Sequence, residues 1–85
     1  MAAPTPWAEA VALRGRWFKD AAEEFRPSLE TRPASDVAAW VVDLEGEVER
    51  YADRAAGRDE GDPREALVRL LAVAGAAIDA MRPTT

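Results

Sequence analysis

The sequence predicts an all-α protein, built as a three-helix bundle within a single domain over residues 1–85. Nineteen of the 85 residues are Ala and ten of the eleven basic residues are Arg, and both types favour helices. Apolar residues repeat with the helical period, and Gly and Pro cluster between these runs. A domain this small buries only about 60 % of the surface of its unfolded chain, so it has little room for an enclosed active site.

The first helix is expected at residues 6–26. Thr5 can cap it, and Pro6 suits its first position because the missing N–H of proline costs nothing there. Pro27 stops the helix, and the segment from Pro27 to Pro33 is expected to be a loop because two prolines six residues apart disfavour a helix between them.

The second helix is expected at residues 36–56, with Ser35 or Asp36 as its cap. Gly57 suits the left-handed position that follows a helix. One face carries the apolar stripe that we expect to form the core: Val37, Trp40, Val41, Leu44, Val48, Tyr51 and Ala55.

The third helix is expected at residues 63–81, where Asp62 caps it and Pro63 occupies its first position. Apolar residues surround it almost completely. One face carries Leu67, Leu70, Leu71, Ala74, Ile78 and Met81, and small or branched residues cover much of the remainder.

Two helices of this length are not expected to surround so apolar a third helix within one chain. We therefore expect the bundle to be completed by self-association or by a partner. Because a Pro-rich loop and a Gly-containing turn join the helices, we expect neighbouring helices to be antiparallel. The alternative is that Ala is a neutral filler at these positions. The expected partner interface consists of Trp7, Trp17, Val68, Ala72, Val73, Ala76 and Ala80.

The formal net charge is -5, and it is concentrated in residues 36–65, where ten acidic residues face four arginines. Such a segment opposes binding to phosphate backbones, so no nucleic-acid partner is expected. The acidic segment is consistent with binding to a basic partner or a divalent cation. The alternative is that it is an ordinary solvated helix face. The expected acidic patch consists of Asp43, Glu45, Glu47, Glu49 and Asp53.

The chain has no Cys and no His, which excludes disulfides, thiol nucleophiles and imidazole acid–base chemistry. Asp43 and Glu47 are four residues apart and can share a Mg²⁺ ion, but two ligands alone make a weak site. We therefore expect no metal, no cofactor and no enzymatic activity.

Residues 36–81 resemble the MazG-like all-α nucleotide pyrophosphohydrolases. That family carries E-E-x-x-E on one helix and E-x-x-D on the next, which together bind Mg²⁺. Asp43 and Glu47 match the outer positions of the first motif, Leu44 stands where a second acid belongs, and Arg64–Arg69 leave the second motif broken. The resemblance implies a related scaffold with weak or absent Mg²⁺-dependent activity.

The sequence thus predicts a small acidic interaction module, an adaptor, regulator or inhibitor, that acts through its third helix and the aromatic residues of its first. The expected partner is another protein or a second copy of the chain. No apolar run reaches the roughly 20 residues that span a bilayer, and no signal peptide is visible, so a cytoplasmic protein without a membrane partner is expected.

Overall fold

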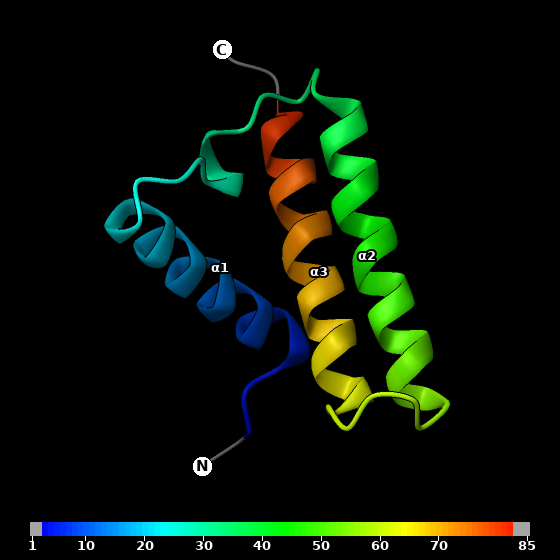
Figure 1. Ribbon diagram of the computed structural model, residues 1–85. Coiled ribbons are helices and arrows are strands. Elements are labelled where there is room, and N and C mark those ends of the chain that lie inside the picture. The colour runs from blue at the N-terminus through cyan, green and yellow to red at the C-terminus, as the bar shows by residue number, and fades with distance from the viewer. Residues whose placement is uncertain (1–2, 83–85) are drawn as a thin grey trace.

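The computed structural model describes residues 3–82. Its elements are the helix α1 (Pro6–Glu23), a short 3-10 turn η1 (Leu29–Thr31), the helix α2 (Val37–Ala55) and the helix α3 (Pro63–Ala80) (Figure 1). The described residues contain no strand, so the prediction of an all-α protein with three helices is confirmed. Within the same residues, no helix is both long and apolar enough to cross a membrane.

The three helices begin where their capping residues predict. Thr5, Asp36 and Asp62 each accept a hydrogen bond from a backbone N–H in the first turn of α1, α2 and α3, respectively. Proline occupies the first position of α1 and of α3. These starts follow from local chemistry, because a capping oxygen satisfies an N–H that has no partner inside the helix.

The first helix ends at Glu23, earlier than the predicted residue 26. Pro27 disfavours the helical conformation at the residue before it, and the chain leaves the helix through Phe25 in the left-handed region (φ 55°). The N–H of Arg26 then reaches back to the carbonyl of Ala21 at 2.8 Å. The second helix ends with the same type of turn at Gly57 (φ 79°), as predicted.

The third helix lies between the other two (Figure 1). It contacts both α1 and α2, whereas the backbones of α1 and α2 do not come close to each other within residues 3–82. Along the α2–α3 contact, Trp40 packs on Val73 near one end and Arg54 bonds Glu65 near the other. The arrangement is therefore a layer of α2 and α3, with α1 packed on the far side of α3.

Small residues on α3 make this central position achievable. Small side chains let α1 and α2 approach α3 closely on two of its sides. Seven residues of α3 are buried: Ala66, Val68, Ala72, Val73, Gly75, Ala76 and Ala77. One buried cluster joins Ala10 of α1 to Val68 and Ala72, and another joins Trp40 of α2 to Val73, Ala76 and Ala77. The two helices cover the small-residue side of α3, which the sequence suggested for a partner, and they leave its leucine side exposed.

The connection between α1 and α2 packs against α3 through η1. The Arg14 side chain of α1 donates hydrogen bonds to Glu30 of η1 at 2.8 and 2.9 Å and to Asp79 of α3 at 2.9 Å. It therefore joins α1, η1 and α3. At the start of α2, the indole N–H of Trp40 donates to the carbonyl of Pro33 at 3.1 Å. The Arg14 contacts hold α1 and η1 beside α3, and the Trp40 hydrogen bond ties the end of the connection to α2.

Candidate functional site

Most of the predicted partner interface lies inside the chain's own core. Val68, Ala72, Val73 and Ala76 are at most 8 % exposed, and Ala80 is half-buried against the Trp40 cluster. Packing against α1 and α2 therefore accounts for the apolar character of these α3 positions. They offer no free surface in this structure.

The two tryptophans of α1 differ in their surroundings. Trp17 is half-buried, packs against both core clusters, and lies under the guanidinium of Arg69 at 5.0 Å from its ring centroid. Trp7 is 52 % exposed, and its ring lies over Gly75 of α3. Only Trp7 presents a large part of its ring to the surface.

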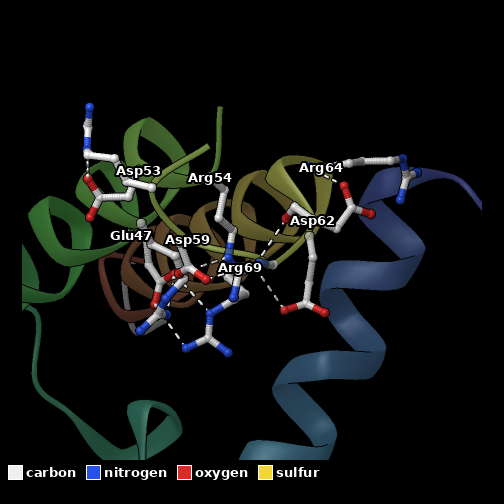
Figure 2. Close-up of polar contacts among 11 residues, drawn as sticks. Glu47, Asp53, Arg54, Asp59, Asp62, Arg64 and Arg69 are labelled. Carbon is white, nitrogen blue, oxygen red and sulfur yellow. Dashed lines mark hydrogen bonds and ion pairs between the residues drawn. The ribbon is translucent and has the colours of Figure 1, made fainter. Parts of the chain in front are cut away.

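The predicted acidic patch is not one open surface. Glu47 is buried, and its carboxylate accepts hydrogen bonds from Arg50 and from Arg69 of α3 at 2.9–3.1 Å (Figure 2). Asp43 accepts from Arg32 at 2.7 Å, and Asp53 pairs with Arg58 at 3.0 Å. Glu45 and Glu49 are exposed on the outer side of α2. Much of the negative charge in this region is thus used to hold the fold.

The carboxylate pair that was considered for Mg²⁺, Asp43 and Glu47, is bound by arginines. Asp43 and Glu47 line a cleft between α1, the connecting loop and α2, together with Trp17 and Arg69. Each carboxylate there already has an arginine partner within 3.1 Å. The part of the chain that the structure describes contains no group of three or more acidic side chains placed to hold a metal ion.

A second network joins the turn after α2 to α3. The Arg54 guanidinium donates hydrogen bonds to the Asp62 carbonyl at 3.1 Å and to the Glu65 carboxylate at 3.2 Å (Figure 2). Its Nε atom lies 3.5 Å from the Asp59 carboxylate. The backbone N–H of Gly61 donates to the Asp59 carboxylate and, as the main cause, lowers the pKa of Asp59 below its ordinary value. A methyl group at Gly61 would overlap the Arg54 guanidinium, so this turn is packed around a glycine.

A large exposed apolar surface lies on the other side of the α2–α3 layer. Glu47 and Arg69 meet on the side of the layer that faces Trp17. On α3 the positions opposite Arg69 are Leu67, Leu71 and Ile78, and on α2 Val41 and Val48 lie about a third of a turn from Glu47. We call this surface the apolar face. It comprises Val37, Val41, Val48 and Tyr51 of α2, Leu67, Leu71 and Ile78 of α3, and Met81 directly after α3, all between 37 and 63 % exposed.

The apolar face continues toward α1. An open hollow of about 360 Å³ is lined by Pro6 of α1 and by Arg64, Leu67, Leu70 and Leu71 of α3, among others, and the exposed surface of its walls is almost entirely apolar. Trp7 lies over Gly75, and on the surface of α3 Leu71 and Ile78 are the helical neighbours of that glycine. The aromatic ring of Trp7 therefore borders the face.

The sequence predicted the wrong side of α3 to be buried in the monomer. It assigned the leucine side and the valine stripe of α2 to the core, and the small-residue side to a partner. Residue size carried the missing signal, because a helix that packs between two others needs small residues on its buried sides. Large side chains then remain on the side that neither neighbour covers.

No family model, no curated protein and no solved structure matches this chain.

Proposed function

We propose that the chain is a small protein-interaction module whose binding surface is the apolar face of α2 and α3. This location replaces the small-residue side of α3 that the sequence suggested. The observation that carries the proposal is the exposure of eight large apolar side chains on two adjacent helices, none of them charged.

The size of the face supports a binding role. Full burial of such a side chain removes roughly 100 Å² of apolar area from water, so eight half-exposed chains present about 400 Å². Monomeric soluble proteins rarely expose a contiguous apolar patch larger than a few hundred Å², and patches of this size often mark interaction sites. Trp7 at its border is of the residue type most often found at binding hot spots.

A matched pair of valines tests the location of the surface. Val41 lies on the face and is 43 % exposed, whereas the adjacent Val42 points outward from α2 and is 66 % exposed. Immobilised wild type, Val41→Glu and Val42→Glu are each used to capture proteins from the source cell, with circular dichroism showing that all three are folded. We expect proteins bound by wild type to be lost with Val41→Glu and retained with Val42→Glu. Equal capture by all three would contradict the proposal.

A further inference from the structure

We infer that the occupant of the apolar face is a second copy of this chain, so that two α2–α3 layers stack face to face as a symmetric dimer. The inference rests on the proposed function and names its partner. Three properties of the face carry it: its two-helix geometry, its lack of charge and its area.

The geometry of the layer suits stacking. In the monomer α2 and α3 are covered on one side by Trp17 and η1, and on the other they leave a two-helix surface. Two such surfaces placed together form a four-helix arrangement, in which each helix has apolar neighbours on both sides. The stripe of α2 that contains Val48 and Tyr51, which the monomer leaves half-exposed, then gains a packing partner.

The charge distribution favours a copy over a charged partner. A two-fold contact brings surface residues close to their own counterparts, so a charged residue near the axis would face its like. All eight residues of the face are uncharged, whereas the chain as a whole carries -5. On α2 the exposed Glu45 lies next to Val41 and Val48, at the rim of the face rather than at its centre, and Glu49 lies farther from it. A basic protein would gain little from a surface without acidic groups.

The area that the apolar face would bury in a dimer reaches the lower limit for specific protein interfaces. Homodimer interfaces are about 65 % apolar, so an apolar core of about 400 Å² corresponds to roughly 600 Å² for each copy. The total of about 1,200 Å² lies at the lower limit for specific interfaces. We therefore expect a dimer that dissociates on dilution rather than a permanent one.

Sedimentation and light scattering on the purified chain test the inference directly. From about 5 to about 500 μM, we expect the mass to rise from 9.2 kDa toward twice that value. Val41→Glu and Ile78→Glu should each weaken association at least about tenfold, and the matched variant Val42→Glu should leave it unchanged. Ile78→Ser removes the apolar side chain without adding charge, and it should weaken association in a chain that stays folded.

Salt dependence gives an independent readout. Added NaCl screens the repulsion between two chains of charge -5, so association of wild type should be maintained or strengthened at higher salt. Association through ion pairs would weaken instead and would contradict the inference.

The outcomes separate this inference from the proposed function. A wild-type chain that remains at 9.2 kDa at the highest concentration overturns the dimer. If the same monomer captures another protein that Val41→Glu loses and Val42→Glu keeps, the face is an interaction surface for a different partner, and only the inference fails. If Val42→Glu disrupts a dimer as much as Val41→Glu does, the dimer forms elsewhere and the inference is also overturned.

Discussion

Glu47 of α2 and Arg69 of α3 are joined by two hydrogen bonds, with Nε donating to Oε2 at 2.9 Å and Nη2 donating to Oε1 at 3.1 Å. The same guanidinium lies over the ring of Trp17 of α1. The Arg69 side chain therefore links all three helices, although the backbones of α1 and α2 do not come close to each other. A residue that the sequence suggested for an acidic surface is therefore part of the internal structure.

We expect Glu47→Gln to lower the free energy of unfolding by about 2 kcal/mol, because it leaves the partly buried Arg69 without its charged partner. Urea denaturation measures this. The control is Glu45→Gln on the exposed side of the same helix, which should change stability by less than about 0.5 kcal/mol.

A double-mutant cycle with Arg69→Gln isolates the Glu47–Arg69 pair. We expect a coupling energy above about 1 kcal/mol for residues in direct contact. Additive effects of the two single changes would show that the pair does not stabilise the fold.

Two helical glycines should respond differently to alanine. Nothing lies within 4 Å of a methyl group at Gly46, so Gly46→Ala should stabilise the protein by about 0.5–1 kcal/mol through helix propensity. A methyl group at Gly75 would come within 2.9 Å of the Trp7 ring, so Gly75→Ala should lose this gain and displace Trp7. Thermal unfolding and near-ultraviolet circular dichroism report both effects. Equal stabilisation by the two changes would mean that Trp7 does not rest on Gly75.

Phe25 and Gly57, which follow α1 and α2 in the left-handed conformation, should change stability in opposite directions when they are substituted. Phe25 is 96 % exposed at φ 55°, so Phe25→Gly relieves backbone strain without losing packing and should stabilise the protein by about 0.5–1 kcal/mol. Gly57→Ala places a Cβ at φ 79° and should destabilise it by about 1 kcal/mol. Chemical denaturation of both variants measures the change in the free energy of unfolding. If Phe25→Gly lowers it, Phe25 contributes packing that its exposure does not show.

Acid should weaken the contact between α1 and α3. The Arg64 guanidinium donates to Glu9 at 2.6 and 3.0 Å and, chiefly through these hydrogen bonds, lowers the pKa of Glu9 below its ordinary value of 4.5. A carboxyl whose pKa is lowered by folding stabilises the fold above its unfolded pKa, and this contribution is lost as the pH falls through the folded pKa.

Arg64→Gln checks that assignment. Carboxyl NMR titration should show the pKa of Glu9 returning toward 4.5 in the variant. The stability difference between wild type and variant that arises from this pair should shrink as the pH falls below the pKa of Glu9. An unchanged Glu9 titration would show that the pair does not form in solution.

The two sides of α3 should respond oppositely to the same substitution. Ala72 is fully buried against Ala10 and Val68, so Ala72→Glu forces a charge into the core and should unfold the protein. Ile78 is 62 % exposed, and Ile78→Glu should leave the monomer folded. Far-ultraviolet circular dichroism and thermal melts distinguish them. A folded Ala72→Glu variant would indicate that α1 does not cover this side of α3.

The sequence by itself determined the helices, because capping oxygens, prolines and Gly57 act on backbone groups within a few residues. It also showed that α3 is apolar on nearly every side. The exception among local features was the end of α1, where Phe25 takes a conformation that favours glycine, and composition gave no sign of it.

Only the tertiary structure decided which apolar sides are buried, and with them the position of the candidate site. Helical periodicity places residues on faces but does not say which neighbour covers each face. Here the small residues around Ala72 and Ala76 allow α1 and α2 to pack closely on two sides of α3. The larger Leu71 and Ile78 are left on the uncovered side, because close packing of helices selects small side chains at the contact and excludes large ones.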